Sequence, residues 1–504
     1  MPHGPNAAGR AMTCVRTIAS AAALGACLVL VAACGSKAPV RQIALTECRV
    51  PKLATAAQCG KVEVPEDRGR PAGPTLAIAV VVLPAATLSP QPDPLIMLPG
   101  GPGQSSDALA PLAGALGGVR RNRDIVLIDP RGTGKSAPLR CAALAPRDAF
   151  DEMADEQTIA IAAQRCIAEL RASGDADPAQ YTTSAVVADV EAVRIALGYD
   201  RINLWGGSYG TRVAQEYLRR YPQHVRSVVL DGAAPPAMRI GFDPWLSRDA
   251  ALDQVIAACA ASPACRQAYP GLDATLARIR ADLARGRTIT VADPRTGAQR
   301  MFKPSFETVI GALQGLVYAP ESASLIPVLL ARAEAGEYAP LIAAAMLLND
   351  DVAKTVNLAL HFAVSCAEDA PRINAAETNR MLARLRAPEL ARRDLAACDG
   401  WPRPRVPADF YAPVVSDKPV LILSGGLDPV TPPAAGEEVA RTLSHSRHIV
   451  AAGYGHIVSP HACAPRLIEK FVEDAGFATL PSSCLDHFSA SARPPLYSSV
   501  LEAR

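Results

Sequence analysis

The chain has 504 residues, with 51 lysines and arginines against 49 aspartates and glutamates. This length allows a large core and one or two domains. The balanced charge contains no block of basic residues, which argues against a concentrated positive surface for nucleic acid or anionic lipids. We therefore expect no nucleic-acid partner.

The N-terminus has the pattern of a secretory signal. Arg10 and Arg16 precede an uncharged, alanine-rich run that ends at Cys34, and a basic segment followed by an apolar one is typical of such signals. The alternative, a transmembrane anchor, needs about 20 apolar residues, and this run is shorter. Its last four residues, Val-Ala-Ala-Cys, resemble a bacterial lipobox. We interpret residues 1–33 as a lipoprotein signal peptide and Cys34 as the lipidated residue, with Met12 as an alternative start.

The remaining cysteines support export to the periplasm or the cell exterior, with the protein anchored to a membrane through the lipid on Cys34. Of 13 cysteines, Cys14 and Cys27 lie in the signal, so ten remain besides Cys34. An even number of cysteines in an exported chain indicates disulfides. Sequential pairing closes the shortest loops: Cys48–Cys59, Cys141–Cys166, Cys259–Cys265, Cys366–Cys398 and Cys463–Cys484. We expect no metal site, because C-x-x-C is absent and the H-x-x-H at 445–448 lacks the glutamate of H-E-x-x-H.

Apolar runs and amphipathic stretches alternate along most of the chain. The runs lie at residues 76–85, 94–103, 124–132, 201–210, 225–235, 419–429 and 447–456. They are short and rich in β-branched residues, which predicts strands buried on both faces. Amphipathic stretches at 183–200 and 210–222 predict helices between them. This alternation favours a mostly parallel α/β sheet flanked by helices.

The stretch from about 240 to 410 has a different, mostly helical pattern. Between 272 and 286, leucines and an isoleucine fall on one helical face, and residues 288–302 suggest a hairpin. We therefore divide the chain after the signal into a first core part (34–239), a mainly helical cap (240–410) and a second core part (411–504).

Residues 129–136, DPRGTGKS, look like the end of a phosphate-binding loop. A P-loop requires glycine five residues before its Gly-Lys pair, and that position is Asp129, followed by Pro130. Proline has no N–H to offer a phosphate, and a carboxylate repels one. The looser dinucleotide pattern GTGKSA is followed at once by Pro138 and by no clear βαβ unit. Both nucleotide interpretations are rejected.

The segment Gly-Gly-Ser-Tyr-Gly at 206–210 follows one predicted strand and begins a predicted helix. This is the context of a nucleophile elbow, in which Ser208 projects above the sheet. A serine needs a base and the base needs an orienting acid, in the order Ser, acid, His. Asp428 and His456 each follow a late predicted strand and take these roles. Asp231 and His461 are the second-ranked alternatives.

An earlier strand ends in Pro-Gly-Gly-Pro-Gly at 99–103. Glycine lets the main chain approach a developing oxyanion closely enough for its N–H to donate. We expect one oxyanion donor from Gly101, with Gly100 as the alternative. The second donor is the N–H of Tyr209, the residue after the nucleophile.

Together these motifs resemble the α/β-hydrolase fold and, within it, the proline iminopeptidase and tripeptidyl aminopeptidase family of serine exopeptidases, with its TAP-like C-terminal segment. The resemblance covers about residues 45–485 and implies an α/β-hydrolase fold with a large helical cap. It rests on GGPG at 100–103, D-x-R-G-x-G-x-S at 129–136, GGSYGT at 206–211, LDPVTP at 427–432 and GH at 455–456. One residue departs from the pattern: Pro99 stands where proline iminopeptidases usually have histidine, which shifts the expectation toward the tripeptidyl branch.

The resemblance implies an exported aminopeptidase that cleaves peptides through an acyl-enzyme, without metal or organic cofactor. Its receptor for the substrate ammonium would come from the cap, where we assign Glu368 and Asp369. A carboxylesterase or lipase with the same triad is the first alternative, and a catalytically silent, peptide-binding lipoprotein is the second. The sequence gives no indication of oligomeric state.

Overall fold

The computed structural model describes residues 43–145 and 158–490. The interpreted signal peptide and the proposed lipidation site Cys34 lie outside these residues. Within them, no helix combines the length and the apolar character that a membrane span requires.

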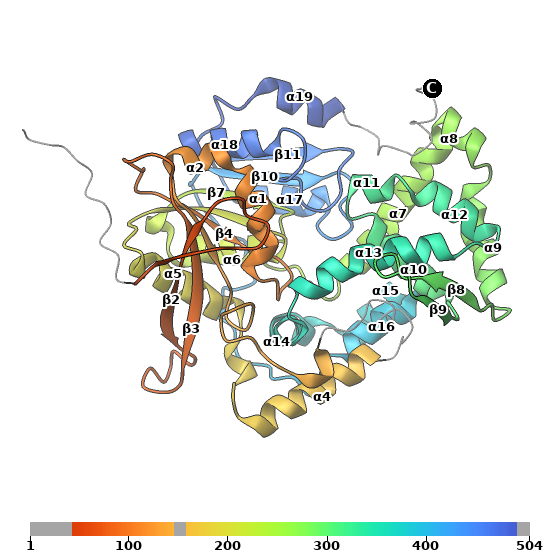
Figure 1. Cartoon of the computed structure of the whole chain (residues 1–504), viewed down its shortest axis with the longest axis horizontal. Coiled ribbons are helices and arrows are strands. Elements are labelled where there is room, and N and C mark those ends of the chain that lie inside the picture. The colour runs from red at the N-terminus through yellow and green to blue at the C-terminus, as the bar shows by residue number, and fades with distance from the viewer. Residues whose placement is uncertain (1–42, 146–157, 491–504) are drawn as a thin grey trace, which may run out of the picture. The chain divides into compact units, whose positions relative to one another are not determined.

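A nine-stranded sheet lies at the centre of the described chain (Figure 1). Its strands are β1 (Thr46–Cys48), β2 (Ala57–Pro65), β3 (Thr75–Leu83), β4 (Leu95–Leu98), β5 (Ile125–Ile128), β6 (Ile202–Gly207), β7 (Val225–Asp231), β10 (Val420–Gly425) and β11 (Ser446–Ala451). Across the sheet they follow the order β1-β2-β3-β5-β4-β6-β7-β10-β11. Neighbours from β5 to β11 pair in parallel. The expected fold class is therefore confirmed.

The N-terminal strands differ from the sequence-based expectation. β1 and β2 were not expected, and β3 pairs antiparallel with both β2 and β5. Alternate residues of β3 are buried and half-buried, which is the pattern of an antiparallel strand with one face toward the core. Because nearly all residues of β3 are apolar, the sequence did not show which of its two faces is buried.

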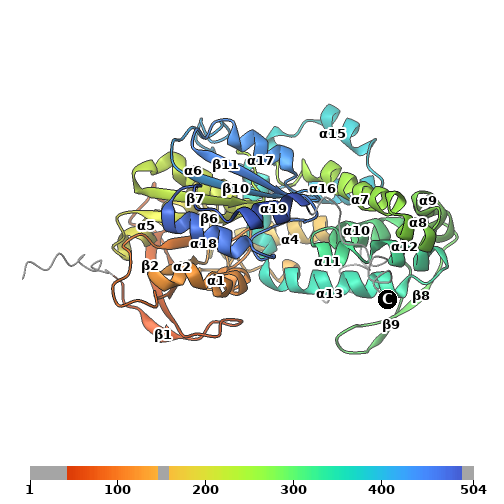
Figure 2. The ribbon, with the colours of Figure 1, turned by 90° about the horizontal axis from the view of Figure 1, so that it is seen from above.

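Helices cover both faces of the sheet (Figure 2). Along β4, Ile96 and Leu98 pack into one core while Leu95 and Met97 pack into the other, because successive strand residues point to opposite faces. One core includes side chains of α5 (Thr183–Ala196), α6 (Tyr209–Arg220) and α17 (Pro433–Ala440). The opposite core includes α1 (Ala110–Ala115), α2 (Gly117–Asn122), α18 (Ala464–Asp474) and α19 (Ser482–Ala490).

Between β7 and β10 the chain leaves the sheet and forms a mainly helical cap with a separate apolar core. Figures 1 and 2 both show α7 to α13 gathered on one side of the sheet. The cap elements are α7 (Pro244–Ala261), α8 (Pro263–Ala268), α9 (Leu272–Leu283), β8 (Ile289–Ala292), β9 (Gln299–Phe302), α10 (Phe306–Leu316), α11 (Pro320–Ala323), α12 (Ile326–Glu334), α13 (Ala339–Thr355), α14 (Leu358–Glu368), α15 (Ala375–Leu382) and α16 (Pro388–Ala396). β8 and β9 form the hairpin that residues 288–302 suggested.

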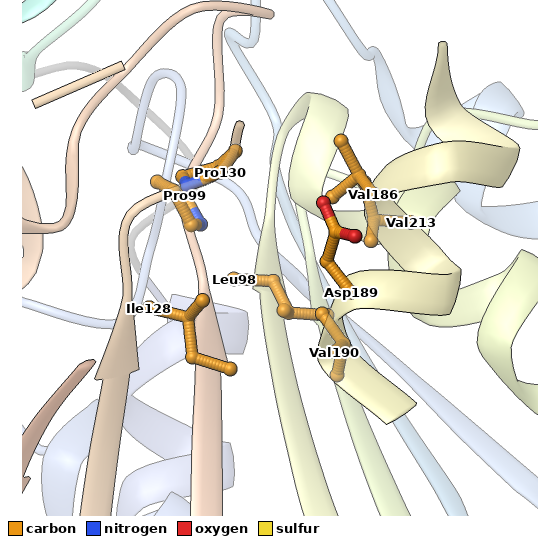
Figure 3. Close-up of a pocket in the computed structure, with 8 residues that line it drawn as sticks. All are labelled: Leu98, Pro99, Ile128, Pro130, Val186, Asp189, Val190 and Val213. Atoms are coloured by element: carbon orange, nitrogen blue, oxygen red, sulfur yellow. The ribbon is translucent and has the colours of Figure 1, made fainter. Parts of the chain in front are cut away.

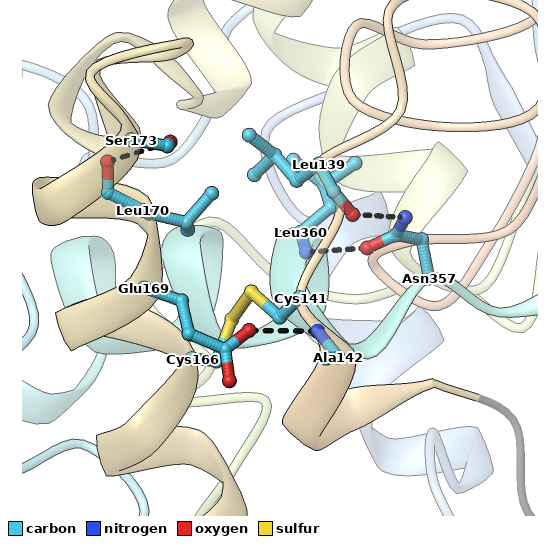
Figure 4. Close-up of a disulfide and its surroundings, with 9 residues drawn as sticks. All are labelled: Leu139, Cys141, Ala142, Cys166, Glu169, Leu170, Ser173, Asn357 and Leu360. Atoms are coloured by element: carbon cyan, nitrogen blue, oxygen red, sulfur yellow. Dashed lines mark hydrogen bonds between the residues drawn. A yellow bond between two sulfur atoms is a disulfide. The ribbon is translucent and has the colours of Figure 1, made fainter.

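Five disulfides join the ten cysteines in the expected sequential pairs, so that prediction is confirmed. Figure 4 shows Cys141–Cys166, which fastens the loop after β5 to α4 (Thr158–Ser173). Beside it, the N–H of Ala142 donates to Glu169 (2.7 Å). The disulfide therefore holds one end of a loop whose other end carries the DPRGTGKS motif.

One residue at the start of α14 connects this loop to the glycine-rich loop after β4. The side-chain amide of Asn357 donates to the carbonyl of Leu139 (2.9 Å), and its Oδ1 accepts the N–H of Leu360 (3.0 Å) (Figure 4). Its main-chain N–H donates to the carbonyl of Gly103 (2.8 Å). Asn357 thus caps its own helix and anchors the cap to two core loops at once.

The DPRGTGKS loop is held by hydrogen bonds within the protein. Asp129 accepts the N–H and the hydroxyl of Ser106 (2.8 and 2.7 Å) and the N–H of Lys135 (2.8 Å). A Cβ on Gly134 would lie 2.3 Å from the Asp129 carboxylate, so this position requires glycine. The motif therefore has a structural role, and its similarity to a P-loop is accidental.

Arg131 is the most deeply buried charge of this loop. Its Nε and one terminal nitrogen donate to both oxygens of Asp189 (2.7 Å each), and its other terminal nitrogen donates to the carbonyls of Glu66 (2.8 Å) and Gln180 (3.0 Å). No part of the Arg131 side chain is exposed, and only 2% of the Asp189 side chain is. The pair ties the loop after β5 to α5 and to the end of β2.

We predict that Arg131→Met lowers the free energy of unfolding by about 3 kcal/mol or more, because it leaves a buried carboxylate without its main partner. Chemical denaturation with the disulfides kept oxidised measures the change. Arg70→Met is the matched control, because Arg70 pairs with Asp67 at the surface and such pairs add little stability. Equal stability of the two variants would contradict the structural role given to Arg131.

Candidate active site

Ser208 occupies a tight turn between β6 and α6. Its backbone has φ +55° and ψ −123°, a conformation that is strained for a residue with a side chain. The glycines on either side are required by space: a Cβ on Gly206 would lie 2.4 Å from the carbonyl oxygen of Gly210, and one on Gly210 would lie 2.2 Å from that of Leu98. The turn therefore has the geometry of a nucleophile elbow.

His456 and Asp428 lie together in the loops after β11 and β10. The Nδ1 of His456 is 2.9 and 3.0 Å from the two carboxylate oxygens of Asp428. Asp428 also accepts the N–H groups of Val430 and Thr431 and the Thr431 hydroxyl (2.8, 2.8 and 2.9 Å). With Nδ1 donating to the acid, Nε2 is left to accept a proton, which is the arrangement a general base needs.

Main-chain contacts bring the nucleophile loop next to this histidine. The N–H of Ser208 donates to the carbonyl of Asp231 (2.9 Å). A Cβ on the following residue, Gly232, would lie 3.1 Å from Cε1 of His456. Among the described residues, no hydrogen bond joins the Ser208 hydroxyl to His456. In enzymes without substrate such a bond is often long and tightens when substrate binds.

The charge of Asp428 sets the basicity of His456. Burial alone would lower the pKa of His456, but the Asp428 charge and hydrogen bond outweigh burial and raise the pKa above its ordinary value. Asp231 acts in the same direction, and Arg248 of the cap acts against it. His456 is therefore a stronger base than a free imidazole.

Neither of the two second-ranked alternatives forms such a pair. Asp231 is fully buried at the end of β7 and accepts the N–H groups of Val458 and Ser459 (2.9 and 2.7 Å). His461 lies 3.7 Å from the exposed Glu321 of the cap. The structure thus places Asp428, and not Asp231, against the imidazole of His456.

The glycine-rich loop after β4 lies directly against the nucleophile. A Cβ on Gly100 would lie 3.1 Å from Cβ of Ser208. The N–H of Gly100 donates to the side chain of Gln104 (3.0 Å), whereas no hydrogen bond of the Gly101 N–H is found in the described chain. Tyr209 begins α6, where the first N–H groups of a helix have no partner within the helix. This geometry favours Gly101 and Tyr209 over Gly100 as oxyanion donors.

A small space lies beneath this loop, between the ends of β4 and β5 and the helices α5 and α6 (Figure 3). Its volume is about 10 Å³, which is enough for about one water molecule. Its lining is mostly apolar: Leu98, Pro99, Ile128, Pro130, Val186, Asp189, Val190 and Val213. This space is therefore too small to hold a peptide.

Glu368 and Asp369 are buried at the end of α14 and have protein partners. Glu368 accepts the N–H and the hydroxyl of Thr183 (2.6 and 2.8 Å) and lies 3.5 Å from Arg212. Asp369 accepts Arg212 (3.1 Å) and the N–H of Ile240 (2.9 Å). Burial raises the pKa of Glu368 to about 7, against the opposing charge of Arg212. A substrate ammonium would have to displace Arg212 or Thr183 to reach these carboxylates.

The structure adds two cap residues to the site that sequence reasoning gave no role. The ring of Tyr318 meets the ring of His456 edge-on with centroids 5.7 Å apart, and the main-chain carbonyl of Tyr318 accepts the main-chain N–H of His456 (2.8 Å). His361, on α14, lies with Nδ1 3.3 Å from the carbonyl of Pro102 in the glycine-rich loop. Burial lowers the pKa of His361, which favours the neutral imidazole. No local sequence motif identifies either residue, because both belong to the helical cap and reach the site only through the tertiary structure.

We predict that Asp428→Asn lowers kcat by about 10⁴-fold, because an amide holds the wrong imidazole tautomer. The same change lowers the pKa of His456, because the carboxylate charge that raises it is lost. Turnover of an activated ester measures the first effect, and NMR titration of the imidazole protons in a Ser208→Ala background measures the second.

Asp417→Asn is the control for this change, because Asp417 is an exposed carboxylate just before β10. It should leave both quantities at the wild-type value. An Asp428→Asn protein with wild-type turnover and an unchanged His456 titration would exclude the histidine–aspartate pair from catalysis.

Comparison with known proteins gives the family context of this geometry. Residues 93–287 match the family described as alpha/beta hydrolase fold, and residues 387–484 match the family described as TAP-like protein. The second match contains Asp428 and His456, and the first contains Ser208. The candidate nucleophile and the candidate base therefore come from segments that match two families.

Three bacterial relatives have similar levels of identity. Carboxylesterase B of Mycobacterium tuberculosis is 32% identical over 426 residues, an alignment that covers 77% of this chain and 78% of that protein. Serine protease Hip1 of Mycobacterium tuberculosis is 33% identical over 204 residues, which is 37% of each chain. Tripeptidyl aminopeptidase of Streptomyces coelicolor is 32% identical over 213 residues, which is 39% of each chain. The matches to the two peptidases thus span less than half of their length.

Proposed function

This chain belongs to the α/β-hydrolase family, in the group with a TAP-like C-terminal segment, and we propose that it is a serine aminopeptidase that releases N-terminal residues or short peptides. The observation that carries the proposal is the His456–Asp428 contact, formed within the TAP-like segment beside a strained serine. The relatives named serine protease and tripeptidyl aminopeptidase support a peptide substrate over other acyl compounds.

The proposed reaction proceeds through an ester on the enzyme. Ser208 attacks the scissile carbonyl while Nε2 of His456 takes the hydroxyl proton, and Asp428 stabilises the imidazolium that results. The N–H groups of Gly101 and Tyr209 donate to the oxyanion. His456 then returns the proton to the leaving amine. Water attacks the acyl-enzyme by the same route in reverse and frees Ser208.

A carboxylesterase is the second candidate function. The relative aligned over 77% of this chain is named carboxylesterase B, and the same triad hydrolyses esters and amides. The two candidates differ in whether a free substrate ammonium is needed. Because Glu368 and Asp369 already have protein partners, this requirement has to be measured on substrates.

We predict that the full chain hydrolyses peptide amides of one to three residues with a free N-terminus and leaves their N-acetylated forms intact. The panel includes proline and alanine peptides and a short-chain nitrophenyl ester, with liberated amine or nitrophenol as readout. Ser208→Ala should remove all turnover while keeping the thermal unfolding midpoint. The favoured peptide length separates the iminopeptidase from the tripeptidyl reaction.

Two outcomes of this panel would contradict the aminopeptidase assignment. Ester hydrolysis without peptide hydrolysis would identify a carboxylesterase. Absence of all turnover together with no labelling by a fluorophosphonate would indicate the catalytically silent, peptide-binding alternative. Activity that persists in Ser208→Ala would exclude Ser208 as the nucleophile.

We also propose that the protein is exported and anchored by a lipid on Cys34. The five disulfides support export, because disulfides form and persist in oxidising compartments. The lipobox-like residues that end at Cys34 support lipidation. The anchor would hold the enzyme at a membrane surface that faces the periplasm or the cell exterior.

We predict that Cys34→Ser abolishes incorporation of labelled palmitate and moves the protein from the membrane fraction to the soluble fraction of a bacterial host. Cys27→Ser is the matched control, because Cys27 lies in the segment that the signal peptidase removes. It should keep both the label and the membrane association. A Cys34→Ser protein that keeps the label would refute the anchor.

A further inference from the structure

Arg248 of the cap has a guanidinium group without a hydrogen-bond or ion-pair partner among the described residues. It lies on the first turns of α7 and stacks on the ring of Trp245, with its Cζ 4.6 Å from the ring centroid. Its Nε is buried and makes no hydrogen bond. In the described part of the chain, no acceptor or carboxylate is paired with its terminal nitrogens either. A buried donor without an acceptor costs free energy, so its retention needs an explanation.

Contacts of the neighbouring residue connect this part of α7, through α10, to the segment that contacts His456. Asp249 accepts the side chain of Gln314 on α10 (2.9 Å) and the N–H of Arg386 (2.9 Å). Gln314 lies one helical turn before Tyr318, whose ring contacts His456. In agreement with this position, the Arg248 charge opposes protonation of His456 and adds to the lowering of its pKa by burial.

Arg248 differs from other arginines of the cap and its border with the core. Arg212 pairs with Asp369, Arg239 with Glu377, and Arg386 with Asp253. Asp394 on α16 is an acid on which the Arg248 charge acts, in the direction that lowers its pKa. The side chain of Asp394 is exposed to solvent, and no hydrogen bond or ion pair joins it to Arg248 in the described structure. The guanidinium is therefore free to bind a ligand.

We propose that Arg248 binds a carboxylate of the substrate, so that the enzyme selects substrates with an anionic group near the bond that it cleaves. A guanidinium that contacts an indole ring can still bind a carboxylate through two parallel hydrogen bonds. The carboxylate is either the C-terminus of a short peptide or an acidic side chain. This proposal rests on the proposed hydrolase function and specifies its substrate class.

Matched substrate pairs test the proposal. The first pair is a short peptide as its free acid and as its C-terminal amide, and the second carries glutamate or glutamine beside the scissile bond. The third pair, a nitrophenyl monoester of succinate and nitrophenyl butyrate, contains no peptide. For each pair, the ratio of kcat/KM for the anionic substrate to kcat/KM for the neutral one is measured in the full-length protein.

We expect the wild-type ratio to exceed one by about tenfold or more in at least one pair, as for a hydrogen-bonded ion pair. Arg248→Gln should bring this ratio close to one, and Arg248→Lys should keep part of it. Arg384→Gln is the control, because Arg384 is an exposed cap arginine, and it should leave the ratio at its wild-type value. The first and second pairs distinguish a C-terminal from a side-chain carboxylate.

The pH profile gives a second readout. Removal of the Arg248 charge should shift the acidic limb of kcat/KM to higher pH, because that charge lowers the pKa of His456. A wild-type ratio of one in every pair, or a ratio that Arg248→Gln leaves unchanged, would overturn the proposal. If peptides are not cleaved but the ester pair shows the Arg248-dependent preference, the aminopeptidase assignment fails and the anion site stands.

Discussion

The position of the cap on the core depends on one buried charge cluster, which consists of Arg212, Glu368 and Asp369. Arg212 lies four residues after the nucleophile on α6, and 1% of its side chain is exposed. Breaking such a cluster leaves an uncompensated charge, which costs about 3–5 kcal/mol, so α14 has one favourable position. The other end of α14 begins at Asn357, which binds the carbonyl of Gly103. The same helix therefore supports the glycine-rich loop that contains the proposed oxyanion donor, and the cap is a structural part of the candidate site.

The sequence predicted the features that follow from local geometry. Around Ser208, the main chain leaves no space for a Cβ at Gly206 or Gly210. The turn therefore requires the same glycines from which the sequence predicted it. The acid and the base each follow a buried strand, and the carboxyl ends of neighbouring parallel strands lie at one edge of the sheet. The disulfide pairing could be predicted from the sequence for a similar reason, because each disulfide closes a short loop. In these cases the spacing of residues along the chain determines their arrangement in space.

Contacts between residues that are distant in sequence could not be predicted from local spacing. In the sequence, Glu368 and Asp369 have no visible partner near the end of their helix. Their partner Arg212 lies more than 150 residues away in sequence. The antiparallel pairing of β3 depends on β2, a strand whose mixed polar pattern gave no signal. In DPRGTGKS the sequence excluded a phosphate-binding loop, but it could not show that Asp129 binds Ser106 and that Arg131 binds Asp189. A charged residue can be assigned a role only when its partner is known.

If Arg248 binds a substrate carboxylate as proposed, the charges around His456 link substrate binding to catalysis. Asp428 and Asp231 raise the pKa of His456, whereas burial and Arg248 lower it. A substrate carboxylate bound to Arg248 would neutralise the charge that weakens the base. His456 would then stabilise the proton taken from Ser208 more strongly in the complex than in the free enzyme. Interactions that improve only after the substrate is bound increase turnover and not just affinity. An anionic substrate would thus be favoured twice, by its contact with Arg248 and by the stronger base that this contact produces.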